Sequence, residues 1–183
     1  DATWFSAICG STYFENVLNV QVPVMTSDNT PSGIASAESS VTNFPPYRAF
    51  DGDNTTEWRS NKSTNTQNGD TYIQYEFAQA VKICKMTAQI WTTPTSSGGQ
   101  ESLSGVVKLQ GSNNNTDYTD ILSANRTFIW GSGSASATQS IDESAQNNNQ
   151  YTSHRIGVSW TGKTVYSLKI GFFYICLYGR KDV

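Results

Sequence analysis

The stretch YIQYEFAQAVKICKMTAQIW, residues 72–91, has the alternating pattern of β-strands. In its first half, the apolar residues Ile73, Tyr75 and Phe77 alternate with more polar neighbours. Because successive side chains of a strand point to opposite faces of a sheet, this pattern predicts a strand with one buried face. We therefore predict two strands here, over residues 72–79 and 81–91.

Similar short stretches occur on both sides of this one. Further strands are predicted at residues 33–40, 105–112, 153–160 and 166–179, with weaker candidates at 120–123 and 126–131. Polar stretches rich in Ser, Thr, Asn and Gly separate them, and the longest are 60–70, 92–102 and 131–150. Several short strands joined by polar loops indicate an all-β sandwich and not βαβ units. The long loops are the expected place for binding, since loops at the ends of a rigid scaffold commonly hold function.

The first 25 residues differ from the rest of the chain in their pattern of apolar and polar residues. In STYFENVL, residues 11–18, apolar side chains recur at helical spacing behind a Ser or Thr that can cap a helix. We predict a short helical segment followed by a strand-like lead-in. The predicted division is an attachment segment over residues 1–25 and one β-sandwich domain over residues 26–183.

Composition excludes two classes of partner. The net charge is −3 and the 12 Lys and Arg residues form no cluster, so attraction to a phosphate backbone is not expected and nucleic acid is a poor partner. The longest apolar run, residues 168–179, is too short for a spanning helix and contains Lys169 and glycines. It is predicted to be a buried strand, with no membrane insertion.

The sequence gives no positive sign of catalysis. His154 is the only histidine, and neither a G-x-S-x-G elbow, an H-E-x-x-H motif nor a paired cysteine motif accompanies it. Pairs of carboxylates that could act together, such as Asp117 with Asp120, lie in polar turn-like contexts typical of solvated loop charges. We predict that the chain is not an enzyme.

The loop YRAFDGDNTTEWRS, residues 47–60, allows three interpretations: a metal site, a ligand site, or a turn leading into a core tryptophan. A calcium ion takes six to eight oxygen ligands, and Asp51, Asp53 and Thr56 can supply some of them. In the alternative, Asp51 caps the turn with its own side chain while Gly52 adopts a positive φ.

A sugar site needs an aromatic face for stacking and planar polar groups that hold hydroxyls in pairs. Aromatic and basic residues in or beside the predicted loops are the candidates. They are Trp130, which is the first choice because it precedes a glycine-serine loop, and Tyr118, Tyr151, His154, Arg155 and Trp91.

The order of several motifs resembles the discoidin, or coagulation-factor type C, family, which includes galactose-binding-like carbohydrate-binding modules of bacterial and viral proteins. The motifs are ASAESS, PYRAFDGDNTTEW, YIQYEF, VVKLQGSNNNTDY and YICLYG, and the resemblance spans roughly residues 30–180. It implies a jelly-roll β-sandwich, galactose-binding-domain-like, of about eight strands with ligands at the loops of one end.

The same resemblance makes specific predictions for the 47–60 loop. It implies that Asp51 and Thr56 hold a structural Ca²⁺ while Asp53 contributes through its backbone. The glutamate by which the family completes this site is replaced by Tyr174. Trp58 is predicted to lie in the core beneath the loop. Its two neighbours should then point outward, which makes Arg59 a further ligand candidate.

The predicted function is therefore a non-catalytic carbohydrate-binding domain on a virion or other extracellular surface. Because the lead-in resembles those of phage tail and head-fibre proteins in texture, host-glycan recognition by a phage fibre is the first expectation. Two alternatives stay open: a structural virion or surface module that binds no glycan, and a carbohydrate-binding appendage of a secreted glycoside hydrolase. The expected partners are cell-surface glycans and other virion or assembly proteins in a multimer.

Overall fold

The computed structural model describes residues 19–61, 68–93, 101–130, 137–144, 148–161 and 169–180. Most of these residues are in β-strands, and there is one short 3₁₀ helix, η1 (Pro46–Ala49). The strands are β1 (Asn19–Gln21), β2 (Ile34–Ala37), β3 (Trp58–Arg59), β4 (Asn68–Thr93), β5 (Glu101–Ser112), β6 (Thr119–Trp130), β7 (Ala137–Ser144), β8 (Tyr151–Thr161) and β9 (Lys169–Arg180).

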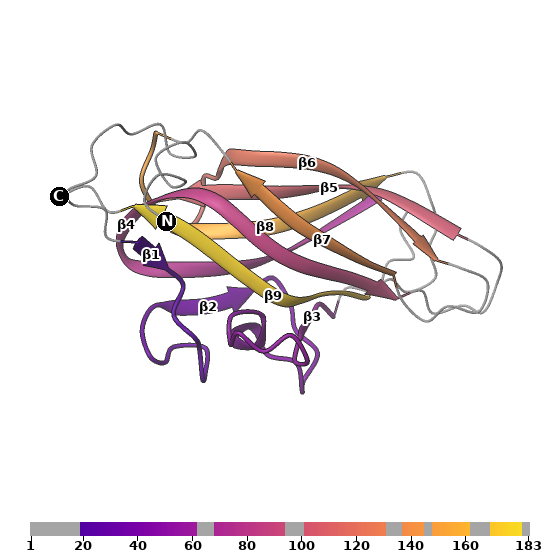
Figure 1. Ribbon diagram of the computed structural model, residues 1–183, viewed down its shortest axis with the longest axis horizontal. Helices are drawn as coiled ribbons and strands as arrows, with labels where there is room; N and C mark the ends of the chain where they lie inside the picture. The colour runs from indigo at the N-terminus through magenta and orange to yellow at the C-terminus, as the bar shows by residue number, and fades with distance from the viewer. Residues whose placement is uncertain are drawn as a thin grey trace.

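Two antiparallel layers make up the sandwich, and the long strand β4 belongs to both (Figure 1). The first half of β4 lies between β2 and β8, and β8 continues to β5 and β6. The second half of β4 lies between β7 and β9, and β9 also pairs with β1 and β3. We call these layers the β8 sheet and the β9 sheet.

Strand β4 changes sheets through irregularities in its pairing. Its register with β8 shifts between Glu76 and Val81, and its register with β9 shifts between Ile83 and Lys85. The second shift moves the buried apolar side chains from odd to even positions. Up to that point they are Ile73, Tyr75, Phe77, Val81 and Ile83, and beyond it they are Met86, Ala88 and Ile90. A bulge of this kind bends a strand, which lets one strand serve both layers.

The core lies between the two sheets and is closed at one side by the segment that precedes β3. β5 contributes Val107 and Leu109, and β8 contributes Ile156 and Val158. That segment adds Met25, Ala35, Ala49 and Phe50, and β3 itself adds Trp58. Trp58 is 0% exposed, which confirms the prediction that it lies in the core.

The strand predictions hold for most of the described chain. The two stretches predicted at 72–91 form the single strand β4, and the two weak candidates at 120–131 form β6. The prediction of a loop over residues 131–150 is wrong, because β7 lies within it. In the part of the chain that the structure describes, β7 pairs with β4 alone. It has one large apolar residue, the buried Ile141, so its sequence shows no alternation of apolar and polar side chains.

The strand-like lead-in is part of the sandwich. β1 pairs with β9, and both Val22 and Met25 are buried in the core. The backbone N–H of Met25 also donates to the carbonyl of Phe50, at 3.0 Å. The β-sandwich therefore includes residues 19–25, while the predicted helix over residues 11–18 lies outside the described residues.

Within the described ranges, no helix has the length and apolarity that a bilayer crossing requires.

Candidate functional site

The outer face of the β8 sheet holds a cluster of aromatic, basic and amide side chains. Tyr72 on β4 lies between the buried residues Thr71 and Ile73, so its side chain points away from the core. Arg155 on β8 points outward for the same reason, since its neighbours His154 and Ile156 are buried. The two strands are adjacent, with Tyr72 opposite Gly157.

The Arg155 guanidinium group lies against two tyrosine rings. Its Cζ atom is 3.7 Å from the ring centroid of Tyr118 and 5.0 Å from that of Tyr72. Contacts of this kind attract a cation to the face of an aromatic ring. We call Tyr72, Tyr118 and Arg155 the tyrosine–arginine cluster.

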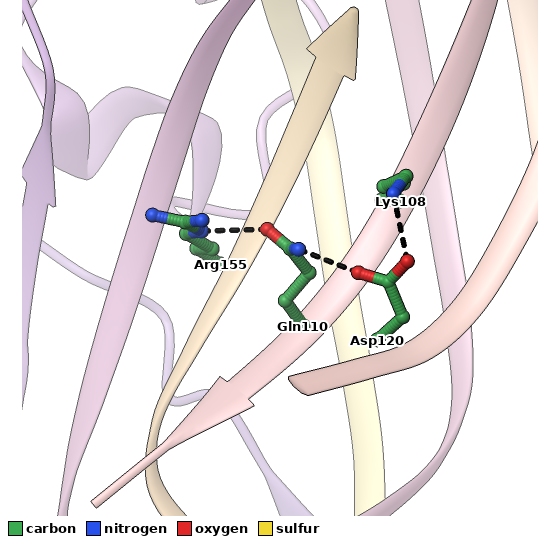
Figure 2. Close-up of polar contacts among 4 residues, drawn as sticks. All are labelled: Lys108, Gln110, Asp120 and Arg155. Carbon is green, nitrogen blue, oxygen red and sulfur yellow. Dashed lines mark hydrogen bonds and ion pairs between the residues drawn. The ribbon is translucent and has the colours of Figure 1, made fainter. Parts of the chain in front are cut away.

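A chain of polar contacts across β8, β5 and β6 orients Arg155 (Figure 2). Arg155 Nε donates to Gln110 Oε1 at 2.6 Å, and Gln110 Nε2 donates to Asp120 Oδ1 at 2.5 Å. Lys108 Nζ donates to the second oxygen of the same carboxylate, at 2.7 Å. The hydrogen bond from Lys108 lowers the pKa of Asp120, so the carboxylate stays ionised and keeps both donors.

The turn between β5 and β6 positions Tyr118. Asn114 Oδ1 accepts the backbone N–H groups of Thr116 and Asp117, at 3.0 and 2.9 Å, which is the local pairing that makes asparagine common in turns. Asn115 adopts a φ of 58° and donates from Nδ2 to Glu76 on β4, at 3.1 Å. The Tyr118 hydroxyl donates to Gln74, also on β4. Burial raises the pKa of Tyr118, so its phenol stays neutral.

A groove of about 190 Å³ adjoins the cluster and is open to solvent. Gly157 contributes to its floor, and a Cβ atom placed there would meet nothing closer than 3.7 Å. The missing side chain at this outward position therefore leaves space between neighbouring strands. The described lining residues are Asp70, Thr71, Tyr72, Lys108, Gln110, Arg155, Gly157, Val158 and Ser159.

Of the predicted ligand residues, Tyr118 and Arg155 come together at this face, while others lie elsewhere. The prediction of His154 as an exposed ligand residue is wrong, because its side chain points into the core and is 1% exposed. Tyr151 is half-buried and packs against the backbone of Gly111, where an added Cβ would lie 2.1 Å from the tyrosine ring. Trp130 ends β6 and Trp91 lies in β4, but their side chains lie outside the described residues.

Arg59 is already engaged by neighbouring side chains. Its guanidinium carbon is 3.8 Å from the ring centroid of Phe44, and it forms an ion pair with Glu57. Glu57 was expected to point outward, and this is wrong, since it is only 8% exposed. Burial of a carboxylate is favourable only with a partner, and Arg59 is that partner.

Sequence reasoning missed Tyr72, Gln110, Lys108 and Asp120 as site residues. The alternation in YIQYEF assigned Tyr72 to the outward face, and the same reading applies to Lys108 and Gln110 beside the buried Leu109. What the alternation could not show is that Gln110 lies opposite Arg155 across the strand pair.

The turn after η1 is held together by its own hydrogen bonds. Asp51 accepts the backbone N–H of Asp53 at 2.9 Å on one oxygen and the hydroxyl of Thr56 at 2.5 Å on the other. Gly52 has a φ of 72°, a conformation that glycine adopts without steric cost. Asp53 accepts the backbone N–H of Thr55 at 2.8 Å, and its hydrogen bonds to Thr55 lower its pKa. These features confirm the predicted capped turn.

The described residues supply part of the oxygen ligands that a calcium site at this turn would need. Asp51, Asp53 and Thr56 provide two carboxylates and one hydroxyl, and backbone carbonyls would have to complete the six to eight oxygens that calcium takes. Elsewhere in the described chain, no three His, Cys, Asp or Glu residues gather as a metal site would require. The side chain of Tyr174 lies outside the described residues, so calcium binding stays a prediction.

Replacing Asp51 tests the turn directly. We expect Asp51→Ala to lower the free energy of unfolding by about 1–2 kcal/mol, because two hydrogen bonds to a carboxylate are lost. The loss in EDTA, measured by denaturant unfolding, gives the effect of the turn alone, with Asn54→Ala, an exposed position of the turn, as the control. A calcium-dependent gain in stability that only Asp51→Ala abolishes would show instead that the turn holds the cation.

A second, larger groove of about 640 Å³ lies between this turn and strands β4 and β7. Its described lining contains three aspartates but no aromatic ring and no basic side chain. These residues are Asp51, Gly52, Asp53, Asn54, Thr87, Ala88, Gln89, Ser140, Ile141 and Asp142. It thus lacks the stacking surface that the smaller groove has.

Comparison with known proteins supports the fold. No family model and no curated protein matches the chain. The structure is similar to the family 32 carbohydrate-binding module of AlyQ in complex with 4,5-unsaturated mannuronic acid, with a TM-score of 0.50 and 15% identity over 86% of this chain and 97% of that one. It is also similar to part of CpGH89 from Clostridium perfringens, solved in complex with GlcNAc-alpha-1,4-galactose, with a TM-score of 0.54 and 13% identity over 85% of this chain and 15% of that one. These likenesses confirm the predicted jelly-roll β-sandwich.

Proposed function

We propose that this chain is a non-catalytic carbohydrate-binding domain whose ligand lies in the groove beside the tyrosine–arginine cluster. The observation that supports this most directly is the combination at one face of aromatic rings, a guanidinium group and a side-chain amide. Sugars are held by stacking on aromatic groups and by planar polar groups that bond hydroxyls in pairs. The proposed site lies on the face of a sheet and not at the loops of one end.

The size of the groove favours a small part of a glycan. Its volume of about 190 Å³ is below the roughly 300–1,000 Å³ of sites that enclose a drug-sized ligand. The site therefore suits one sugar unit, with weak affinity for a single domain. Presentation of several copies on one particle or surface would raise the overall affinity without new contacts.

The setting that we propose is an extracellular or virion surface, with host-glycan attachment by a phage fibre as the first candidate. This part of the proposal depends on the pattern of apolar and polar residues in the lead-in sequence, residues 1–25. An enzyme appendage is the second candidate, because the likeness to CpGH89 covers only 15% of a chain that was solved with its substrate. If the chain is instead a surface module that binds no glycan, no glycan should bind in the groove. The next experiment tests this.

Filling the groove at Gly157 should weaken binding. Valine fits a strand, its Cβ atom would meet nothing closer than 3.7 Å, and its methyl groups would occupy space in the groove. We expect Gly157→Val to weaken binding to any glycan that the wild-type domain selects on an array by about tenfold or more. Affinity is to be measured by titration calorimetry, and thermal unfolding shows whether the variant is folded.

A matched substitution separates the groove from a general effect of valine. Ser144→Val, at an exposed position of β7 in the other sheet, should leave binding unchanged. If Gly157→Val binds as well as the wild type, the groove is not the site. If the wild-type domain binds no glycan on a broad array, the carbohydrate-binding function is wrong and the structural-module reading takes its place.

A further inference from the structure

We propose that the sugar recognised in this groove bears a carboxylate, which Arg155 binds through its two terminal nitrogens. The inference rests on the proposed function and adds the chemical class of the ligand. It comes from what Arg155 does and does not contact on the outer face of the β8 sheet.

Few of the N–H donors of Arg155 are used to hold its side chain in place. Among the described residues, its only hydrogen bond is from Nε to Gln110, and the other contacts are with the faces of Tyr72 and Tyr118. The aromatic contacts restrain the guanidinium plane without using its N–H groups. The two terminal Nη atoms are therefore available to a ligand in the groove that Arg155 lines.

The neighbouring carboxylate does not compete for these nitrogens. Both oxygens of Asp120 already accept hydrogen bonds, one from Lys108 and one from Gln110 (Figure 2). Because Asp120 accepts from the amide nitrogen of Gln110, the amide oxygen faces Arg155. Asp120 thus sets the orientation of Gln110, and Gln110 in turn takes the Nε donor and leaves the Nη pair.

The guanidinium group of Arg155 forms no direct ion pair with a carboxylate among the described residues. Lys108, which also lines the groove, is paired with Asp120, and the acidic lining residue Asp70 is exposed. Glu76, further along β4, accepts a hydrogen bond from Asn115 of the β5–β6 turn. An acidic sugar would bring to Arg155 the counter-charge that the cluster itself does not supply.

A carboxylate also fits the shape of the free donors. Guanidinium and carboxylate groups are planar and form two parallel hydrogen bonds, which are shorter and about twice as strong as those between neutral groups. Since the rings and Gln110 already restrain the side chain, little conformational freedom is lost when the ligand binds. A neutral sugar hydroxyl could accept hydrogen bonds from the same donors, but it would not add the attraction between opposite charges.

The test compares ligands that differ only in the charge of this group. Polygalacturonate and its fully methyl-esterified form are one pair of probes, and sialyllactose and its carboxyl methyl ester are the other. We expect the wild-type domain to bind the acidic member of at least one pair about tenfold or more tightly than the neutral member, and added salt to reduce this preference. Which pair shows the preference distinguishes a uronic acid from a sialic acid.

Arg155→Lys keeps the positive charge but removes the planar pair of donors. We expect it to lose most of the preference for the acidic probe, while Arg48→Lys in η1, remote from this face, keeps it. Thermal unfolding of both variants checks that they fold.

The possible failures are distinguishable. Equal binding of the acidic and neutral probes, weakened by Gly157→Val, would overturn the carboxylate inference and leave the proposed function standing. An undiminished preference in Arg155→Lys would overturn the role given to the guanidinium plane. Failure to bind any probe or any arrayed glycan would overturn both proposals.

Discussion

Replacement of Trp58 by alanine is expected to lower the free energy of unfolding by about 3–5 kcal/mol. The indole is 0% exposed, so its removal leaves a large cavity between the sheets. Its Nε1 atom also donates to the carbonyl of Ser39 at 3.1 Å and to the hydroxyl of Ser40 at 2.9 Å, and both acceptors would lose a partner. Denaturant unfolding followed by far-ultraviolet circular dichroism measures the change.

Ile34→Ala is the matched control for this prediction. Ile34 is a large apolar residue in β2, but it is 50% exposed, so its truncation should change stability by no more than about 0.5 kcal/mol. Similar losses in the two variants would contradict the central place of Trp58 in the core. They would also weaken the reading of residues 51–56 as the turn that delivers this tryptophan to its position.

Acidification from pH 6.5 to pH 5 is expected to lower the free energy of unfolding by about 2 kcal/mol through His154 alone. Burial lowers the pKa of His154 from 6.5 to about 3 in the folded chain. Both ring nitrogens are buried and make no hydrogen bond among the described residues. Two aromatic rings, of Phe77 and Tyr151, lie with their centroids 5.6 and 6.0 Å away, so an imidazolium would have no acceptor there.

The sign follows from which state takes up the proton. Between pH 6.5 and about 3 the unfolded chain protonates its histidine while the folded chain does not, so stability is lost as the pH falls. The stabilisation is fully present above pH 6.5. The slope should approach about 1.4 kcal/mol per pH unit below that value, and urea unfolding at a series of pH values measures it.

His154→Leu should remove this slope, because the chain has a single histidine. Leucine also replaces the two nitrogens that lack partners with apolar surface, so the variant should fold. Carboxylates contribute mainly below about pH 5, which makes the window from pH 5 to 7 specific for the histidine. A slope of the same size in His154→Leu would show that another group causes the acid sensitivity.

Local patterns in the sequence predicted those structural features that depend on residues adjacent in the chain. The alternation around Tyr75 predicted a strand and its buried face, and the Asp51–Gly52 pair predicted a capped turn with a positive φ. β7 was missed because Ile141 is its one large apolar residue. Its position depends on pairing with the distant strand β4, which no local pattern reports.

The candidate site was predictable only in part, for a similar reason. Tyr118 and Arg155 were singled out by residue type, yet His154 was chosen with them although neighbouring residues of one strand must point to opposite faces. The association of Arg155 with Gln110 and Tyr72 depends on the register of β8 with two other strands. Register is set by the packing of the whole sandwich, so it is beyond a reading of single segments.

Because the single strand β4 belongs to both sheets, it links the two sheets mechanically, which separate strands would not do. Its first half carries Tyr72 beneath the proposed ligand, and its second half lies between β7 and β9 in the opposite layer. A pull on the bound glycan would therefore pass along one continuous backbone into both layers at once. The force would act against two sets of inter-strand hydrogen bonds together, which would suit the proposed attachment of this domain to a glycan-bearing surface.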